Sequence, residues 1–497
     1  MKKFICLHGH FYQPPRENPW TGEVGLEPSA SPFHDWNERI SKECYEANVQ
    51  APIMDASGQI VERVNNFEAI SFDIGPTLLS WMRAKDPATY GAILDADRKS
   101  VLERNGHGNA IAQCYNHLIM PLAGRRDKIT QVRWGVRDFE FHYKRKPEGM
   151  WLPETAVDRE TLSIMAEQGI RFTILSPHQA SRMRSLGVGS RWQPVQEAFI
   201  DTRQAYRIVL DQGRQLHLFF YDAPISRDIA FGGALNNGDE FARRLAGAFG
   251  WLDRPQLVSA AVDGETFGHH HRFGEMAVAY ALKKIKDTHQ AKLTNFGEFL
   301  AHHGSFSEVD IYERSSWSCP HGVERWRSNC GCRIHPQEGS NQLWRASLRE
   351  SFDFLKEIVD DVFVSEGPIL LRDPWEARND YVEILLEDSA RQRAKFLQKH
   401  AAKKPGLEEE RKIWDLLEAQ KLSLFMFTSC GWFFDELSGI EPAIVMRFAA
   451  RAIERIRPYV KENFEEKFFS ILRQAQSNLA DQGTGEDIFR RVTAHGF

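Results

Sequence analysis

The sequence predicts an α/β domain over residues 1–304 followed by an α-helical domain over residues 305–497. A chain of 497 residues is too long for one ordinary hydrophobic core. In the first part, short apolar runs alternate with amphipathic stretches, as in a mostly parallel β/α layer or barrel. The clearest of these strand-like runs are residues 171–175, 216–221 and 256–262. Farther on, apolar residues recur every three or four positions, which indicates helices. These expected helices are residues 341–361, 380–400, 408–427 and 442–479.

Composition narrows the possible partners and the location. Lys and Arg total 63 against 68 Asp and Glu, a net charge of −5, and basic residues nowhere gather beside exposed aromatics. We therefore expect an uncharged substrate and no nucleic-acid partner. The start lacks a signal-peptide core, and apolar runs stay below the roughly 18 residues that span a bilayer. With an odd number of cysteines, seven, the chain is expected to be cytoplasmic, without a membrane partner.

The segment Met150-Trp151-Leu152-Pro153-Glu154 places a carboxylate just after a short apolar run. Pro153 keeps Leu152 out of the helical region, so Glu154 is expected on a stiff turn at a strand end. Trp151 offers a flat face on which a sugar ring can stack. A core Trp151 and a helix-capping or surface Glu154 would give the same local pattern.

A second acidic segment, Asp263-Gly264-Glu265, follows the small-residue strand at residues 259–262. Gly264 permits a tight turn or the close approach of a ligand. Two desolvated carboxylates two residues apart raise each other's proton affinity, so one can stay protonated near neutral pH as a general acid. A surface acidic turn is the simpler alternative. The histidines at 269–271 can bind hydroxyls, bind a metal or cap the next helix.

Two further segments place histidines beside apolar stretches. His8 and His10 follow a predicted strand, and residues two apart on an extended chain point the same way, so both can face one pocket. Such a pair can bind a polyol or contribute to a metal site, but a metal needs further ligands. His117 lies between Tyr115 and the apolar residues 118–122, where a structural role is the default.

Four of these segments, in this order, carry a family resemblance. They are His8-x-His10-x-x-Gln13-Pro14, Tyr115-x-His117 with Pro121-Leu122, Trp151-Leu152-Pro153-Glu154, and Asp263-Gly264-Glu265-x-Phe267-Gly268-His269. Together they closely resemble the signature regions of glycoside hydrolase family 57, over about the first three hundred residues. The resemblance implies an incomplete (β/α)7 barrel followed by helices, and retaining chemistry on α-glucans.

Carried over by position, the resemblance makes Glu154 the nucleophile and Asp263 the general acid/base. A retaining mechanism needs two carboxyl groups about 5–5.5 Å apart, one ionised and one protonated. The expected substrate-binding residues are His8, His10, His117, Trp151, Glu265, His269, Trp317 and Trp432. Two departures from the family pattern, the inserted Phe11-Tyr12 and His270 after the Gly-His pair, leave open the choice among amylase, glucanotransferase and branching enzyme.

The helical part has cysteine-bearing segments that resemble the extension of an uncharacterised branch of the family. Cys319, Cys330, Cys332 and Cys430 can form a thiolate metal site if their segments meet, although Cys-x-Cys is not the usual knuckle spacing and free cysteines are often simply buried. We assign no cofactor and no metal ligand from the sequence, and leave this point open.

Two other functions remain compatible with the sequence. One is a metal-dependent carbohydrate deacetylase or mannosidase-like hydrolase with His8, His10 and Asp263 around zinc. The other is a carbohydrate-binding or regulatory protein that has lost turnover. The presence of both Glu154 and Asp263 favours the glycosidase or transglycosidase.

Overall fold

The computed structural model describes residues 2–187 and 189–494, which form two compact units. The first unit comprises residues 1–13, 26–113 and 139–313, and the second comprises residues 14–25, 114–138 and 314–497. The expected boundary at residue 304 therefore needs correction. Strand β14 (Ser305–Ile311) pairs with strands of the first unit, and two segments of the expected first domain join the second.

The first unit is α/β, and four of its strands coincide with the expected apolar runs or the opening strand. Its strands before β14 are β1 (Lys3–Phe11), β2 (Ala51–Met54), β3 (Ile60–Val64), β4 (Ser71–Ile74), β5 (Ala112–Gln113), β6 (Met150–Trp151), β7 (Phe172–Leu175), β8 (Ala180–Ser185), β9 (Gln193–Pro194), β10 (Ala205–Val209), β11 (Gln215–Phe220), β12 (Gln256–Asp263) and β13 (Lys292–Leu293). Its helices are α1 (Trp36–Ile40), α2 (Glu46–Val49), α3 (Pro76–Lys85), α4 (Pro87–Glu103), α6 (Arg159–Glu167), α7 (Ala223–Arg227), α8 (Gly238–Ala246), α9 (Gly274–Asp287) and α10 (Phe296–His303).

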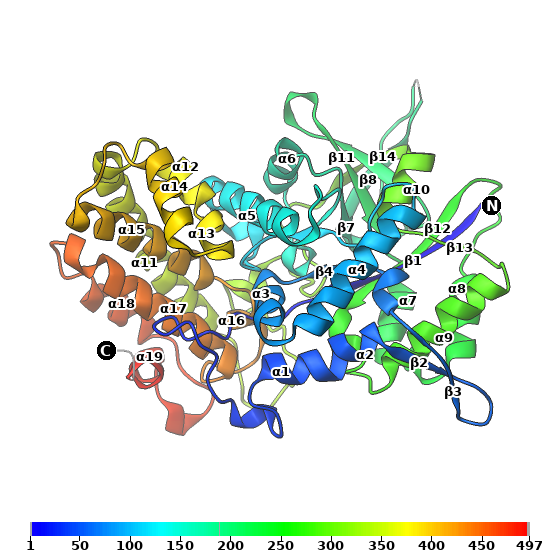
Figure 1. Cartoon of the computed structure of the whole chain (residues 1–497), viewed down its shortest axis with the longest axis horizontal. Coiled ribbons are helices and arrows are strands. Elements are labelled where there is room, and N and C mark those ends of the chain that lie inside the picture. The colour runs from blue at the N-terminus through cyan, green and yellow to red at the C-terminus, as the bar shows by residue number, and fades with distance from the viewer. Residues whose placement is uncertain (1, 188, 495–497) are drawn as a thin grey trace. The chain divides into compact units, whose positions relative to one another are not determined.

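A run of parallel neighbours organises this unit. Strand β1 lies between β12 and β4 (Figure 1), β5 pairs with β6, and β7 pairs with β11, all in parallel. Isolated parallel bridges from Phe72 to Ala110 and from Gly149 to Phe172 join these pairs into one succession. Beyond β11, Asp222 N donates to Ser259 O of β12 at 2.7 Å, which brings the last strand of the run back to the first.

The central strands read as continuous apolar runs because they are buried on both faces. Every residue of β1 after Lys3 is buried, and so is every residue of β12 before Asp263. This burial is typical of parallel strands covered by helices. Only the carboxyl end of β12 emerges, and it does so at an acidic residue.

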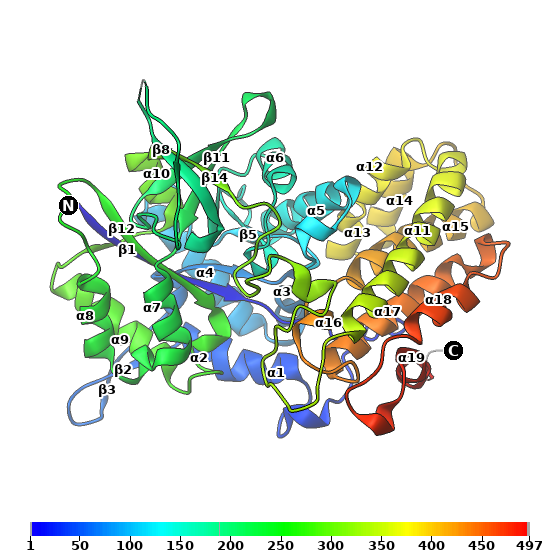
Figure 2. The same ribbon diagram turned by 180° about the vertical axis from the view of Figure 1, so that it is seen from behind.

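The second unit is helical. Its helices are α11 (Trp344–Leu370), α12 (Pro374–Asp380), α13 (Val382–Leu386), α14 (Ala390–His400), α15 (Leu407–Phe425), α16 (Cys430–Phe433), α17 (Ile440–Ile456), α18 (Glu465–Leu472) and α19 (Gly485–Thr493). Helices α11, α15 and α17 pack side by side (Figure 2). Helix α5 (Arg125–Tyr143) contains the boundary between the units at residues 138 and 139.

Two expected helices are interrupted. The expected helix at 442–479 ends at Ile456, because Pro458 lacks the N–H that a continuing helix requires. The expected helix at 380–400 divides into α13 and α14, and Ser389 caps the second by accepting a hydrogen bond from Gln392 N at 3.2 Å. Both breaks coincide with residues that favour a helix boundary.

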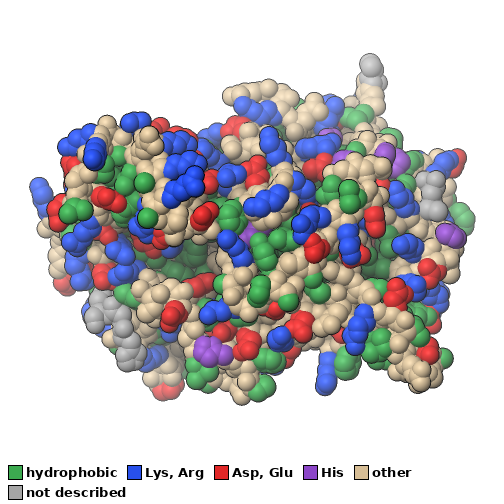
Figure 3. Space-filling model, in the orientation of Figure 1, with side chains coloured by type: hydrophobic (Ala, Val, Ile, Leu, Met, Phe, Trp, Pro, Cys, Tyr) green, Lys and Arg blue, Asp and Glu red, His purple; other side chains and the backbone are tan. Residues whose placement is uncertain are grey.

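Among the described residues, the helices are all too short or too polar to cross a membrane. On the face shown in Figure 3, acidic and basic side chains are interspersed. This mixture agrees with the nearly balanced numbers of acidic and basic residues in the sequence.

Candidate active site

Neighbouring strands of the first unit bring polar side chains together at their carboxyl ends. His10 on β1 is in register with Asp263 on β12 and with Asp73 on β4. Glu154 lies three residues beyond the end of β6. Loops and side chains at this end of a parallel sheet are the usual place for a ligand site.

Asp73 holds both histidines of the N-terminal pair. His8 Nε2 lies 3.0 Å from Asp73 Oδ1, and His10 Nδ1 lies 2.8 Å from Asp73 Oδ2. On the other side of the His8 ring, Nδ1 is 3.1 Å from Ser71 Oγ. The expectation that His8 and His10 point the same way is confirmed, and the group that they share is the Asp73 carboxylate.

The two histidines have opposite pKa shifts. Burial lowers the pKa of His8 and outweighs Asp73, which raises it, so this imidazole is neutral. Burial also lowers the pKa of His10, but Asp73, and then Asp263 and Glu265, outweigh it and raise the pKa to about 9. Near neutral pH His10 is therefore a buried cation, held by an acidic cluster.

Trp151 packs on this pair. Its ring stacks on His8 at a centroid distance of 4.9 Å and on His10 at 5.1 Å, and the side chain is fully buried. His8 is also fully buried. This placement favours a positioning role for Trp151 and His8 over the expected direct contact with a sugar, because both side chains are enclosed by protein.

Glu154 stands on a strained turn. It belongs to the 3-10 segment η5 (Pro153–Thr155), and both Glu154 and Thr155 have positive φ, 56° and 49°. Side chains other than glycine rarely adopt this region, which costs on the order of 1–3 kcal/mol where neighbours enforce it. Leu152 is extended, as the following proline requires.

A buried glutamine clamps this turn. Thr155 Oγ1 donates to Gln179 Oε1 at 2.9 Å, and Gln179 Nε2 donates back to Thr155 O at 2.8 Å. Ser176 N also donates to Gln179 Oε1 at 2.9 Å. These hydrogen bonds hold the backbone in its strained conformation. Such support is expected where a side chain must be positioned accurately.

Asp263 is the group best suited to donate a proton. Its side chain is exposed, yet protein atoms surround it closely and raise its pKa from 3.8 to about 6. The positive charge of His10 lowers this pKa, and the negative charges of Glu154 and then Asp73 raise it. Glu154 is therefore close enough for its charge to act on Asp263.

Glu265 is buried directly beyond this group, on η10 (Gly264–Thr266). Its Oε1 accepts hydrogen bonds from Tyr12 N at 3.0 Å and from Tyr45 OH at 3.3 Å. Burial, followed by the charge of Asp263, raises the pKa of Glu265 to about 8. The two carboxyl groups therefore titrate in sequence, Asp263 first, and Glu265 is neutral when Asp263 changes charge.

The turn that carries Asp263 and Glu265 is held by hydrogen bonds from the segment before β2. Cys44 Sγ donates to Gly264 O at 3.4 Å, and Asn48 Nδ2 donates to Phe267 O at 2.6 Å. Gly268 is required here, because its φ is 131° and a Cβ would lie 2.4 Å from Glu43 O. His269 is held at its Nδ1 by Glu43 Oε2 at 2.5 Å and remains half-buried.

Three of the expected substrate-binding residues belong to the second unit. His117 has a positive φ of 54°, and its Nδ1 lies 2.7 Å from Ser429 Oγ, so it lies beside the segment that carries Trp432. Trp432 is buried and donates from Nε1 to Arg345 O at 3.2 Å, which favours a packing role. Trp317 is half-buried.

Sequence reasoning missed the residues that orient the others. Asp73, Tyr45 and Gln179 lie outside the recognised segments, although each contacts one of them. The sequence feature that could have indicated Asp73 is its position two residues after Ser71 on a short buried strand, where both side chains point to the same face. A carboxylate on a buried strand needs partners, and here those partners are the two histidines.

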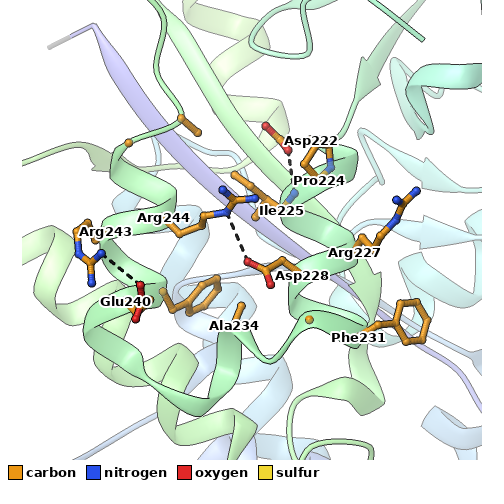
Figure 4. A pocket seen from close by; sticks show the side chains of 14 residues that line it. Asp222, Pro224, Ile225, Arg227, Asp228, Phe231, Ala234, Glu240, Arg243 and Arg244 are labelled. Atoms are coloured by element: carbon orange, nitrogen blue, oxygen red, sulfur yellow. Dashed lines mark hydrogen bonds and ion pairs between the residues drawn. The ribbon is translucent and has the colours of Figure 1, made fainter. Parts of the chain in front are cut away.

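A surface cavity of about 930 Å³ lies elsewhere in the first unit, along α7 and α8. Figure 4 shows Arg244 directed at Asp228 and Arg243 directed at Glu240, pairs separated by 3.5 and 3.3 Å. The residues that line this cavity do not include Glu154 or Asp263. The catalytic candidates are therefore identified by their chemistry and not by their position in the surface cavity.

Comparison with protein families decides the classification. The family model described as glycosyl hydrolase family 57 matches residues 6–312, more than half of the chain. The chain belongs to glycosyl hydrolase family 57. This membership confirms the expected family and the enzyme class, glycoside hydrolase or glucanotransferase. Residues 341–495 match a domain of unknown function, DUF3536, and no curated protein matches the sequence.

Solved structures share the fold of this family member. An exo-type maltose-forming amylase from Pyrococcus sp. ST04 is 17% identical, with a TM-score of 0.66 over 99% of this chain and 88% of that one. A family 57 branching enzyme from Thermococcus kodakaraensis is 15% identical, with a TM-score of 0.56 over 99% and 96%. A 4-alpha-glucanotransferase from Thermococcus litoralis is 14% identical, with a TM-score of 0.56 over 93% and 61%.

The zinc-hydrolase alternative lacks its ligand set among the described residues. A metal site needs several ligand atoms gathered around one point. His8, His10 and Asp263 do not form such a group, whereas Cys319, His321, Cys330 and Cys332 in the second unit do. Among the described residues, the group with the geometry of a metal site is therefore this cysteine and histidine cluster, and it includes neither His8 nor His10.

Proposed function

We propose that this family 57 enzyme acts on α-glucan by a retaining mechanism, with Glu154 as nucleophile and Asp263 as general acid/base. The observation that carries the proposal is the electrostatic coupling of these carboxyl groups, in which Glu154 helps to raise the pKa of Asp263 to about 6. Retaining glycosidases need such a pair, in which one group attacks and the other donates a proton.

In the first step, a carboxylate oxygen of Glu154 attacks the anomeric carbon. The bond from that carbon to the glycosidic oxygen breaks, and Asp263 transfers its proton to the departing oxygen. The products are a free sugar end and a glycosyl ester on Glu154. The Gln179 clamp on Thr155 keeps the attacking group in place, so little ordering is needed during the reaction.

The second step follows from the same coupling. Once Glu154 is an ester, its negative charge is gone and no longer raises the pKa of Asp263. The pKa of Asp263 then falls, which favours the ionised form that must take a proton from the incoming acceptor. The acceptor oxygen bonds to the anomeric carbon as the ester bond breaks, and Glu154 is regenerated. Water as acceptor gives hydrolysis, and a sugar hydroxyl gives transfer.

The neighbouring groups adjust this cycle. His10 stays protonated up to a pH of about 9 and, with its positive charge, keeps the pKa of Asp263 from rising further. Glu265 stays neutral below a pH of about 8 and adds no negative charge beside Asp263 when the acid is needed. Asp73 orients His10 and, with its own charge, also raises the pKa of Asp263, which makes it a positioning residue.

Family membership and the activities of the similar amylase, glucanotransferase and branching-enzyme structures support α-glucan as the substrate class. We also infer that the run of parallel strands from β12 to β11 is the incomplete (β/α)7 barrel expected of the family. His117, His269 and Trp317 remain proposed substrate contacts, whereas the burial of Trp432 favours a packing role. Seven free cysteines support a reducing, cytoplasmic location.

The proposal is tested by incubating the purified protein with maltooligosaccharides and amylose. We expect shortened or rearranged chains with the wild type and a loss of at least about a thousandfold in kcat with Glu154→Gln or Asp263→Asn. The exposed Asp253→Asn, which removes a carboxylate from the surface, serves as the matched control. Absence of products with the wild type, or full activity in either site variant, would overturn the assignment.

Azide separates the two roles. Glu154→Ala supplied with azide and an activated α-glucosyl donor should yield a glycosyl azide, because the small anion occupies the place of the missing nucleophile. The azide product should have inverted configuration at the anomeric carbon. If Asp263→Ala instead gave the glycosyl azide of inverted configuration, and Glu154→Ala gave none, the roles of the two residues would be the reverse of those proposed.

A further inference from the structure

Three cysteines and one histidine of the second unit converge in space. The Sγ atoms of Cys319 and Cys332 are 3.7 Å apart, and those of Cys319 and Cys330 are 4.0 Å apart. Cys332 Sγ lies 3.6 Å from Nδ1 of His321. All four ligand atoms lie within 4.8 Å of one another, around a common centre.

These separations match the edges of a tetrahedron around a zinc ion. With Zn–S of about 2.3 Å and Zn–N of about 2.0–2.1 Å, tetrahedral edges are about 3.8 Å between sulfurs and about 3.6 Å between sulfur and nitrogen. A disulfide would instead bring two sulfurs to about 2.05 Å. The spacing therefore fits four ligands that share one ion.

We propose that Cys319, His321, Cys330 and Cys332 bind one Zn²⁺ as a closed structural site. Soft thiolate ligands combined with one imidazole in a tetrahedral arrangement are typical of zinc. Four protein ligands fill the coordination sphere, so the ion has no open position for water or substrate. The site is independent of the proposed glycosidase chemistry and stabilises the fold.

The surrounding charges complement a site of this kind. Zn²⁺ with three thiolates and a neutral imidazole carries a net charge of −1, and such a charge needs a positive neighbour. The guanidinium of Arg345 is fully buried and donates from Nη1 to Cys332 O at 2.9 Å. Its Nη2 also forms an ion pair with Asp435 Oδ1 at 4.0 Å, and the metal complex would add a second negative group beside this buried cation.

The site would fasten an irregular part of the chain. Between β14 and α11, the described chain has one regular element, the 3-10 turn η11 (Glu324–Trp326), and Figure 2 shows this yellow-green segment as a long loop. Loops of this length with so little secondary structure are uncommon in compact domains. The zinc would join the two halves of this loop, and Asp435 already holds it by accepting hydrogen bonds from Ile334 N and His335 N at 2.9 and 2.6 Å.

This ligand set corrects the group considered from the sequence. The described structure places His321, and not Cys430, with the other three cysteines. The motif is Cys-x-His, then eight residues, then Cys-x-Cys, which differs from the two-residue knuckle spacing. Spacing alone could not reveal it, because the loop that follows Cys319 has to fold back before the two pairs meet.

The first test is the metal content of the purified full-length protein, measured by mass spectrometry after extensive dialysis. We expect about one zinc per chain in the wild type and in the matched control Cys430→Ser, and less than about a fifth of that in Cys330→Ser. Wild-type protein without zinc, or zinc retained in full by Cys330→Ser, would overturn the proposal. Stoichiometric iron in place of zinc would overturn the assignment of the ion.

A second test needs no substitution in the site. Thiols bound to zinc react slowly with alkylating reagents, so iodoacetamide should leave Cys319, Cys330 and Cys332 unmodified in the native protein. Removal of the metal with a chelator should make these three reactive at least about tenfold faster, while Cys430 reacts at the same rate in both states. Equal alkylation before and after chelation, or a mass loss from a disulfide in the native protein, would contradict the zinc site.

Discussion

The pairing of His10 with Asp73 should make the stability of the first unit depend on pH in a defined window. The pKa of His10 is raised from 6.5 to about 9, and the side chain is only 4% exposed. A group whose pKa is higher in the folded state stabilises that state fully below its unfolded pKa. The contribution is then lost as the pH rises through the folded pKa. Stability should therefore fall between pH 6.5 and pH 9.5.

The size of this effect follows from the shift. A difference of about 2.5 pH units at about 1.4 kcal/mol per unit corresponds to about 3.5 kcal/mol in the free energy of unfolding. Asp73 is the first of the charges that raise this pKa, so Asp73→Asn should remove most of the His10 contribution to the decline, while the contribution from the raised pKa of Glu265 stays. The variant is expected to be less stable than the wild type at pH 6.5 and to approach it at pH 9.5.

Urea denaturation at the two pH values measures the effect, with the tryptophan fluorescence of the whole chain as the signal. Asp380→Asn is a matched control, because Asp380 also contacts a histidine, His400, at 2.9 Å. The pKa of Asp380 is lowered to about 2, so its contribution is lost only as the pH falls through that value and is constant above pH 6.5. An unchanged pH dependence in Asp73→Asn would refute the reasoning, as would a wild-type stability that rises with pH.

Three further predictions concern the acidic turn. Because Asp263 must be protonated to release the leaving group, kcat/KM on a maltooligosaccharide should fall about tenfold per pH unit above pH 6, and a plateau that extends to pH 8 would contradict this. Glu265→Gln should keep kcat/KM at pH 6 within about threefold of wild type, since Gln imitates the neutral acid; a loss above about a hundredfold would show that the charge is needed. Gly264→Ala should lower the free energy of unfolding by about 1–3 kcal/mol, because a Cβ would lie 2.4 Å from the Phe11 ring, whereas Gly91→Ala, with nothing within 4 Å, should not.

The layers of the fold could be predicted from the sequence, and the same sequence suggested Glu154 and Asp263 as the proposed catalytic pair. Buried parallel strands are continuous apolar runs, so β1, β7, β11 and β12 could be recognised directly. The stiff turn at Glu154 was predictable, because Pro153 keeps Leu152 in an extended conformation. The strained φ of Glu154 and Thr155 was not, because it depends on a clamp by Gln179, more than twenty residues away.

Other parts of the site depend on contacts that local patterns do not contain. The role of Asp73 becomes visible only when β4 lies beside β1 and its carboxylate meets both histidines. Similarly, Trp151 is buried and stacks on the two imidazoles, although its sequence context is equally compatible with an exposed ring. Side chains that act through tertiary partners are therefore the ones that sequence reasoning missed or misjudged.

The central claim is that Glu154 forms a covalent bond to the sugar while Asp263 exchanges the proton. The most direct measurement is to trap the intermediate with a 5-fluoro-α-glucosyl fluoride and to locate the attached sugar by peptide mass spectrometry. We predict a single glucosyl ester on the peptide that contains Glu154, absent from Glu154→Gln. An ester on Asp263 or Glu265, or turnover of the reagent to a product of inverted configuration without any labelled peptide, would contradict the account.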